Sequence, residues 1–385
     1  MKRSKKSGKL EHKILIAPNS FKENLSSVKI AEILKTEMEK ILPGNFSSTS
    51  FPLSDGGDGF LEVVKVRFAT ESMKFEIDYP YQSERKLNVF VEFDKGRKRV
   101  FVESAKALGL EIVAPEKRNP LELTSRGLGQ LLKQIRTVAL SGEVDVKEVV
   151  IGLGGSATQD LGLGALSEFG VRLFHFAKYI PVEPKFFSRA DRISYNKRDL
   201  KFPFKITFVA DVDNPLIGEK GSVRTFAKQK GAGDSAIEIL EKGFKNILRL
   251  LHVKSAEGLS GAAGGIAAGF KLLADDVEVI GAKKFMEEVL GLNSIARPDF
   301  LLTGEGKLDA TTLDGKAPSV VIEKFTESVE RIFFVAGKSE IDLKNNKAVV
   351  ISLTELFGSE KKAKANSVEG LKIAARKISN MILEN

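Results

Sequence analysis

One glycine-rich segment, residues 148–165, constrains this chain more than any other stretch. An apolar run at 148–153 passes directly into glycines and hydroxyl side chains, and small residues that could begin a helix follow. A strand, a glycine turn and a helix start expose backbone N–H groups to an anion. The segment therefore predicts a phosphate site with magnesium, unless its glycines only pack a tight turn. Its candidate ligand-binding residues are Gly154, Gly155, Ser156, Thr158 and Asp160.

Alternation of apolar runs with helical repeats predicts an α/β fold. Several short apolar runs pass directly into loops that carry glycine or a carboxylate, and helical periodicity lies between them. This alternation is typical of a parallel sheet, whose ligands bind at the carboxyl ends of the strands. β-forming clusters within 74–103 indicate inserted antiparallel hairpins, whereas 171–200 has no regular pattern. The apolar runs lie at 14–18, 49–53, 148–153, 206–210, 298–303 and 331–336.

We therefore predict two α/β domains that follow a basic flexible tail at residues 1–13. Residues 14–70 and 296–385 are expected to form a Rossmann-like domain with a parallel sheet. Residues 71–295 are expected to form a second, mixed α/β domain inserted in the middle of the chain. In this arrangement the active site is expected in the cleft between the domains.

Composition excludes several classes of site. The chain of 385 residues has no cysteine, which excludes disulfides, thiolate catalysis and cysteine-based metal centres. Its three histidines lie far apart, without metal-ligand spacing. The tail holds six basic residues and one glutamate, so it carries +5 of the net charge of +9, and the remaining charges are interspersed. Nucleic acid and membranes are therefore not expected partners, and the cytoplasm is the expected location.

Carboxylates recur in the loops that follow the apolar runs. Phosphoryl transfer needs magnesium, positioned cations and an acceptor for the hydroxyl proton, and magnesium prefers carboxylates with phosphate oxygens and water. Single acidic residues in such loops are commonly turn formers or caps, but their repetition at strand ends favours phosphoryl chemistry. Walker and protein-kinase motifs are absent, and GxGxxG fits poorly. The acidic residues are Asp55, Asp58, Asp160, Asp211, Asp213, Glu305 and Asp309.

Ordered sequence blocks extend over most of the chain. They include IAPNSFK at 16–22, PLSDGGDGF at 52–60, TSRGLG at 124–129, GLGGSATQD at 152–160, QKGA at 229–232 and TGEGKLD at 303–309. In this order the blocks resemble class I glycerate kinases, bacterial enzymes that phosphorylate D-glycerate at O2. The resemblance implies transfer of the ATP γ-phosphate to D-glycerate with Mg2+, giving 2-phosphoglycerate and ADP. It leaves open whether the protein is a monomer or a homodimer.

The resemblance and the residue chemistry together suggest roles for the first loops. Ser20 and Lys22 are predicted to bind the transferring phosphate or the substrate carboxylate. Either Asp58 or Asp160 is predicted to accept the proton of the glycerate hydroxyl, and the sequence does not choose between them. Arg126 is a candidate clamp for the carboxylate, because a guanidinium can bind it bidentately; the alternative is an arginine on a helix surface.

The later loops supply the remaining candidates. Asp211 and Asn214 are predicted to shape the cleft or hold magnesium, although an Asn-Pro turn would explain Asn214 as well. Glu305 and Asp309 are candidates for contact with nucleotide or metal, and Lys316 lies close to them in sequence. The predicted metal ligands are thus Asp211 and Asp309.

Departures from the family pattern keep other functions open. Asn19 stands where the family usually has aspartate, so a changed substrate preference is one expectation. The six residues Gly-Leu-Gly-Gly-Ser-Ala also resemble the phosphate loop of GHMP sugar and mevalonate kinases. A kinase for another hydroxy acid or sugar is therefore one alternative. A sensor that binds ATP without turnover is a second, and a nucleic-acid protein that uses the basic tail is a third.

Overall fold

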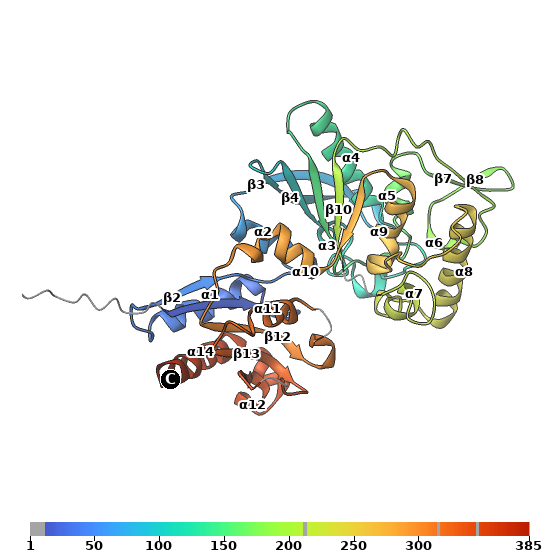
Figure 1. The fold of residues 1–385 in the computed structure, drawn as a ribbon. Coiled ribbons are helices and arrows are strands. Elements are labelled where there is room, and N and C mark those ends of the chain that lie inside the picture. The colour runs from blue at the N-terminus through green and yellow to red at the C-terminus, as the bar shows by residue number, and fades with distance from the viewer. Residues whose placement is uncertain (1–11, 211–213, 314–315, 344–345, 385) are drawn as a thin grey trace, which may run out of the picture. The chain divides into compact units, whose positions relative to one another are not determined.

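The computed structural model describes residues 12–210, 214–313, 316–343 and 346–384. The chain folds as two compact units, each of which is described here by itself. Unit 1 combines Met1–Ser54 with Ala282–Asn385, and unit 2 comprises Asp55–Gly281. In Figure 1, blue and orange-to-red elements make up most of unit 1, and the colours between them mark unit 2.

Unit 1 is built on a parallel sheet of five strands in the order β14-β13-β12-β1-β2. These strands are β14 (Ala348–Ser352), β13 (Arg331–Ser339), β12 (Phe300–Leu308), β1 (His12–Pro18) and β2 (Phe46–Ser50). Its helical elements are α1 (Ser27–Glu39), α10 (Ala282–Lys284), η3 (Phe285–Val289), η4 (Leu292–Ser294), η5 (Ala310–Leu313), α11 (Ala317–Phe325), α12 (Leu353–Phe357), α13 (Glu360–Ala365) and α14 (Ser367–Leu383).

The apolar run of β1 is buried on both faces of this sheet. Ile14 and Ile16 belong to a core that includes residues of α1 and α14, and Leu15 between them is equally buried. Because neighbouring strand residues point to opposite faces, this run needs a cover on each side. Helix α11 contacts β1 and β12, and α1 packs against α14. The continuous apolar pattern is thus that of a central parallel strand, as the sequence predicts.

Unit 2 contains a mixed sheet of six strands in the order β11-β10-β6-β5-β4-β3. Its first four strands pair in parallel, and β3 and β4 add an antiparallel hairpin. These strands are β11 (Val277–Ile280), β10 (Lys205–Val209), β6 (Glu148–Gly152), β5 (Arg99–Glu103), β4 (Gln82–Asp94) and β3 (Glu71–Tyr79). A parallel sheet in one unit and a mixed sheet in the other confirm the predicted α/β class.

The remaining elements of unit 2 surround this sheet. Its helical elements are α2 (Phe60–Arg67), α3 (Ala105–Leu108), η1 (Pro115–Lys117), α4 (Arg126–Leu140), α5 (Leu163–Ser167), α6 (Pro184–Phe187), α7 (Ser222–Phe226), η2 (Lys228–Lys230), α8 (Asp234–Leu250) and α9 (Ala262–Leu273). A small antiparallel sheet is formed by β8 (Lys178–Ile180), β7 (Arg172–His175) and β9 (Arg192–Ser194). Strands this short carry too few residues for periodicity, which is why 171–200 shows no pattern in the sequence.

The division into units falls earlier in the chain than the boundaries expected near residues 70 and 296. Helix α2 belongs to unit 2 because it packs on β4 and β5, where Phe60 meets Phe101 with ring centroids 6.3 Å apart. The sequence pattern does not reveal this tertiary contact. His12 and Lys13, assigned to the tail from the sequence, begin strand β1. The rest of the predicted tail lies outside the described residues.

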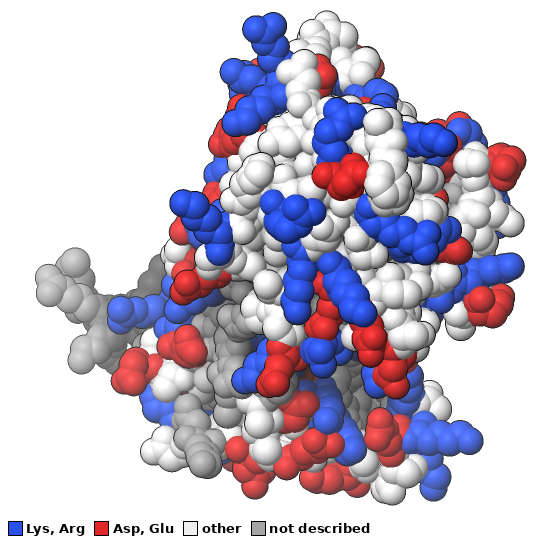
Figure 2. Space-filling model, turned by 90° about the vertical axis from the view of Figure 1, so that its right-hand side faces the viewer, with Lys and Arg blue, Asp and Glu red and all other residues white. Residues whose placement is uncertain are grey.

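The surface carries both signs of charge. Figure 2 shows Lys and Arg side chains interspersed with Asp and Glu on the face in view. Across the described ranges, no helix combines the length and the hydropathy needed to cross a bilayer.

The start of α9 shows why the sequence places small residues there. Ala263, Gly264 and Gly265 have φ angles of 51°, 71° and 82°, a left-handed run that glycine tolerates best. Further along the helix, a Cβ on Gly269 would overlap the carbonyl oxygen of Leu161. The helix therefore approaches the glycine-rich segment of the sequence at backbone distance.

This close approach predicts a large effect of one methyl group. Gly269→Ala is expected to lower the free energy of unfolding by about 2–3 kcal/mol, because α9 must move away from Leu161. Gly233→Ala is the matched control, since no atom lies within 4 Å of its Cβ position. Urea denaturation of both variants measures the difference. Equal stability of the two variants would contradict the close approach.

Candidate active site

The glycine loop, residues 153–162 between β6 and α5, is held from several sides within unit 2. The N–H of Gly154 donates to the carbonyl of Gly56 at 2.9 Å, and the N–H of Ala157 donates to that of Leu108 at 2.8 Å. A Cβ on Gly154 would overlap Gly57, and Gly155 has a φ angle of 71°. Both glycines are therefore required by the local backbone. The N–H of Gly154, one of the residues predicted to cradle phosphate, is thus satisfied inside the protein, as is that of its neighbour Ala157.

The two hydroxyl residues of this loop point inward. Ser156 and Thr158 are both buried. The Ser156 hydroxyl accepts a long hydrogen bond of 3.4 Å from the ammonium of Lys230. The Thr158 hydroxyl has no hydrogen-bond partner among the described residues, although a buried hydroxyl ordinarily has one. This orphaned group is therefore a place where a ligand or water could bind.

Asp160 is fully buried and joins the loop to the segment before α4. Its Oδ2 accepts hydrogen bonds from the N–H and the hydroxyl of Ser125, at 2.7 and 2.8 Å, and from the N–H of Gly164 at 3.1 Å. Its Oδ1 accepts from the N–H of Gly162 at 3.1 Å. Burial raises the pKa of Asp160, and these four bonds oppose the rise. Because all four partners of Asp160 are donors, they favour its ionised carboxylate. Asp160 therefore has the geometry of a structural anchor.

Asp58, the other candidate for the proton acceptor, is exposed to solvent. It lies next to the glycine loop, because a Cβ on Gly155 would be 3.0 Å from its Oδ1. Glu103, at the end of β5, is close enough for the Asp58 charge to raise its pKa, although burial is the main cause of that rise. The structure therefore brings Asp58 and the glycine loop together, with the carboxylate open to a ligand.

Lys230 is a functional candidate that the sequence offers only as one of several cations, without a specific role in the site. Its side chain is only 3% exposed, and its ammonium donates to the carbonyl oxygen of Thr158 at 2.7 Å. Burial lowers the pKa of Lys230 from 10.5 to about 7, and the Asp160 charge opposes this shift. The available sequence signal was the block Gln-Lys-Gly-Ala at 229–232, which the resemblance included without a role.

Five predicted residues meet in a cavity of about 460 Å3 within unit 1, at the carboxyl ends of β1, β12 and β13. Strand β12 extends beyond the predicted 298–303, because Lys307 still pairs in register with Lys338 of β13. Glu305 is therefore held on a strand and not in a loop. The predicted residues that line the cavity are Ser20, Lys22, Glu305, Asp309 and Lys316.

The charges in this cavity differ in how they are paired. Lys307 contacts Asp309 at 3.3 Å, and Lys338 contacts Glu340 at 3.1 Å. Lys22 makes no ion pair within the described ranges and is exposed, so its charge is available to an anion. Burial raises the pKa of Glu305, and one of its carboxylate oxygens has no hydrogen-bond partner among the described residues. The cavity thus offers both an unpaired cation and an unsatisfied carboxylate oxygen.

Asn19, the departure from the family pattern, has a local role in the loop after β1. Its side-chain oxygen accepts a hydrogen bond from the N–H of Ser20 at 2.9 Å, and its own N–H donates to the carbonyl of Gly304 at 2.8 Å. An aspartate could accept the first bond equally well. The change therefore removes a charge at this buried position without removing the turn that presents Ser20.

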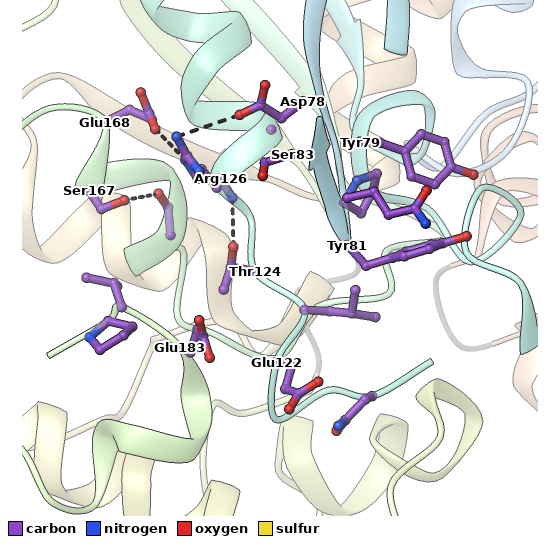
Figure 3. Close-up of a pocket in the computed structure, with 18 of the residues that line it drawn as sticks. Asp78, Tyr79, Tyr81, Ser83, Glu122, Thr124, Arg126, Ser167, Glu168 and Glu183 are labelled. Carbon is purple, nitrogen blue, oxygen red and sulfur yellow. Dashed lines mark hydrogen bonds and ion pairs between the residues drawn. The ribbon is translucent and has the colours of Figure 1, made fainter. Parts of the chain in front are cut away.

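Arg126 lies in a different cavity of unit 2, of about 820 Å3, which Figure 3 shows. Its guanidinium contacts Glu168 at 2.7 Å and Asp78 at 3.6 Å. Glu168 is the main reason that the pKa of Arg126 rises. A substrate carboxylate would have to compete with two carboxylates already present. No residue of the loop 153–162 lines this cavity, although Ser125 beside Arg126 binds Asp160.

The predicted pair Asp211 and Asn214 is described only in part. Asp211 lies outside the described residues. The carbonyl of Asn214 accepts the N–H of Gly261 at 2.8 Å, and its side-chain amide donates weakly to the carbonyl of Lys220 at 3.5 Å. These contacts hold the turn after β10 next to the start of α9.

Comparisons with known proteins agree on one family. A sequence profile of the Glycerate kinase family matches residues 14–383. A protein from Escherichia coli (strain K12) named Glycerate 2-kinase is 32% identical, over 86% of this chain and 86% of its own length. A Glycerate kinase from Halalkalibacterium halodurans is 31% identical, over 84% of this chain and 85% of that relative.

A solved structure supports the same assignment. The protein from Salmonella typhimurium LT2, provisionally named glycerate kinase 2, aligns with a TM-score of 0.73 and 29% sequence identity. The alignment covers 97% of this chain and 98% of that one. A family match over 14–383 and relatives at 30% identity or more over most of both chains give one conclusion. The chain belongs to the glycerate kinase family.

Proposed function

We propose that this kinase transfers the γ-phosphate of ATP to the C2 hydroxyl of D-glycerate, giving 2-phosphoglycerate and ADP. The observation that carries the proposal is the cavity of unit 1, where lysines surround Glu305 and Asp309 at the strand carboxyl ends. Cations in this place suit anionic substrates, and Lys22 is unpaired there. The name Glycerate 2-kinase of the Escherichia coli relative supports transfer to O2.

The proposed chemistry needs an acceptor for the hydroxyl proton. We assign this role to Asp58, because it is exposed next to the glycine loop, whereas Asp160 is buried with both oxygens bonded. The C2 oxygen forms the new bond to the γ-phosphorus, the bond from that phosphorus to ADP breaks, and the hydroxyl proton passes to Asp58. The transition state is loose, so positioning of the groups contributes more than base strength.

Mg2+ fits the donor set of unit 1. Glu305 has an unsatisfied buried oxygen, and Asp309 is close enough for its charge to act on Glu305. Magnesium commonly uses one or two protein carboxylates, with phosphate oxygens and water as the other ligands. Glu305 and Asp309 would hold the ion, which would neutralise charge on the phosphates. Ser20 and Lys22 would bind the transferring phosphate or the substrate carboxylate from the same cavity.

The proposal is tested at Lys22. Lys22→Met is expected to lower kcat/KM for glycerate phosphorylation by ~30-fold, because an unpaired cation that contacts substrate contributes about 2 kcal/mol. Lys35→Met on α1 is the matched control, since Lys35 is a partly exposed lysine with a long 3.8 Å contact to Glu39. The measurement is ADP release with D-glycerate, ATP and MgCl2.

The outcomes of this assay separate the alternatives. Turnover by the wild-type protein with a selective loss in Lys22→Met supports the proposal. Equal rates in the two variants would remove Lys22 from the site. Faster turnover of homoserine, mevalonate or a sugar than of D-glycerate would replace the substrate, and ATP binding without any turnover would make the protein a sensor.

A further inference from the structure

Lys230 differs from the other described lysines in its burial. Of the lysines in the described part of the structure, it alone is buried. It ends the short turn η2, and Gly231 follows with a φ angle of 95°, where a Cβ would overlap the carbonyl of Arg118. The N–H of Lys230 donates to the carbonyl of Ala227 at 3.0 Å. Its backbone is therefore fixed, and the side chain extends to the glycine loop from a rigid base.

The ammonium of Lys230 connects two residues of that loop. It donates to the carbonyl oxygen of Thr158 at 2.7 Å and to the hydroxyl of Ser156 at 3.4 Å. An ammonium has three donors, and only these two bonds are present among the described residues. The nearby hydroxyl of Thr158 lacks a partner as well. The buried side of the loop thus has donor capacity that the protein itself does not use.

The charge of Lys230 is incompletely compensated. Asp160 acts on it electrostatically, but no ion pair joins the two residues in the described structure, and Asp160 is bonded to Ser125, Gly162 and Gly164. Moving an ammonium out of water is costly unless it is paired. An anion bound at the loop would supply the missing partner and would stabilise the ammonium form.

We propose that Lys230 is a positioning residue of the phosphate loop, whose ammonium form holds Ser156 and Thr158 in the arrangement that binds the phosphates of ATP. This inference rests on the proposed kinase function and on the phosphate-binding role that the sequence predicts for the loop, and it adds a protonation requirement to that role. In the protein without ligand, the pKa of Lys230 is about 7. Phosphate binding above that pH must therefore draw a proton from solvent to form the ammonium. A lysine that only filled space would show no such linkage.

Proton uptake on ATP binding tests the inference directly. The probe is ATP with MgCl2, titrated calorimetrically at pH 8 in buffers of different ionisation enthalpy. The wild-type protein is expected to take up protons on binding. Lys230→Met is expected to bind ~10-fold more weakly without that uptake, because the charge is lost. Lys228→Met is the control, since Lys228 lies in the same turn but is exposed and contacts Asp234 at 3.1 Å.

A conservative variant keeps the test valid if Lys230→Met folds poorly. Lys230→Arg retains a charge that does not titrate. It is expected to bind ATP at pH 8 without proton uptake and with more affinity than Lys230→Met. Equal uptake in the wild type and in Lys230→Arg would overturn the inference. Wild-type protein that bound no ATP would overturn both the inference and the proposed function, whereas ATP binding without uptake would overturn the inference alone.

Stability gives a second readout that needs no ligand. The folded pKa of about 7 lies below the ordinary value of 10.5, so the unfolded chain binds more protons between those pH values. The contribution of Lys230 to the free energy of unfolding therefore rises from pH 7 to 10.5. Urea denaturation is expected to show the wild type gaining stability relative to Lys230→Met over this range. A constant difference would contradict the depressed pKa.

Discussion

Replacing Asp58 with asparagine is expected to lower kcat for glycerate phosphorylation by roughly 100-fold or more, because the acceptor for the hydroxyl proton is lost. The side chain is exposed beside Gly155. The asparagine amide has nearly the same shape as the aspartate carboxylate, so the melting temperature of Asp58→Asn is expected to stay within a few degrees of the wild type. The measurements are steady-state kinetics and thermal denaturation of the same preparation.

Asp55→Asn is the matched control for this prediction. Asp55 belongs to the same loop, but its Oδ1 accepts the N–H of Gly57 at 3.0 Å, a bond that an asparagine oxygen can also make. It is expected to retain most of the wild-type kcat. If Asp55→Asn lost as much activity as Asp58→Asn, loop geometry and not proton transfer would explain both effects. Full activity of Asp58→Asn would remove Asp58 as the proton acceptor.

Asp160→Asn is expected to lower the free energy of unfolding by about 2–4 kcal/mol, because it leaves buried donors without acceptors. Four hydrogen bonds from Ser125, Gly162 and Gly164 converge on the two carboxylate oxygens. An asparagine has one oxygen, so its NH2 group must face at least one of these donors. Urea denaturation at neutral pH measures the loss.

Asp145→Asn provides the comparison for a surface carboxylate. Asp145 is exposed and pairs with Lys98 and Lys147, so its replacement is expected to leave the stability close to that of the wild type. Asp160→Asn protein as stable as wild type, yet without turnover, would reverse the assignment and make Asp160 the proton acceptor. Together the Asp58 and Asp160 variants thus resolve the choice that the sequence leaves open.

The sequence predicts the strands, the loops at their ends and the family, because these depend on local sequence patterns. The apolar run before Pro18 and the run at 148–153 form strands that pair in parallel with both neighbours, because a buried parallel strand needs a continuous apolar segment. The loop after β1 and the segment around Glu305 meet because both lie at the carboxyl ends of neighbouring strands of one parallel sheet. Motif order then identifies the family, which no single loop could do.

The roles of individual site residues depend on contacts between distant segments, which the sequence does not show. Asp58 and Asp160 are both aspartates in glycine-rich loops, and only burial and the partners of Asp160 separate them. Lys230 is one of many lysines in the sequence, and its buried contact with Thr158 joins residues far apart in the chain. Arg126 is a candidate clamp because a guanidinium can bind a carboxylate bidentately, but its contacts with Glu168 and Asp78 follow from tertiary packing.

The most direct test of the central claim is the identity of the product. The protein is incubated with ATP, MgCl2 and D-glycerate, and the phosphorylated product is examined by proton–phosphorus correlation NMR. The account predicts that phosphorus couples to the single proton on C2, as in 2-phosphoglycerate, and that ADP forms in equal amount. Coupling to the two protons on C3, or the absence of phosphorylated glycerate, would contradict the account.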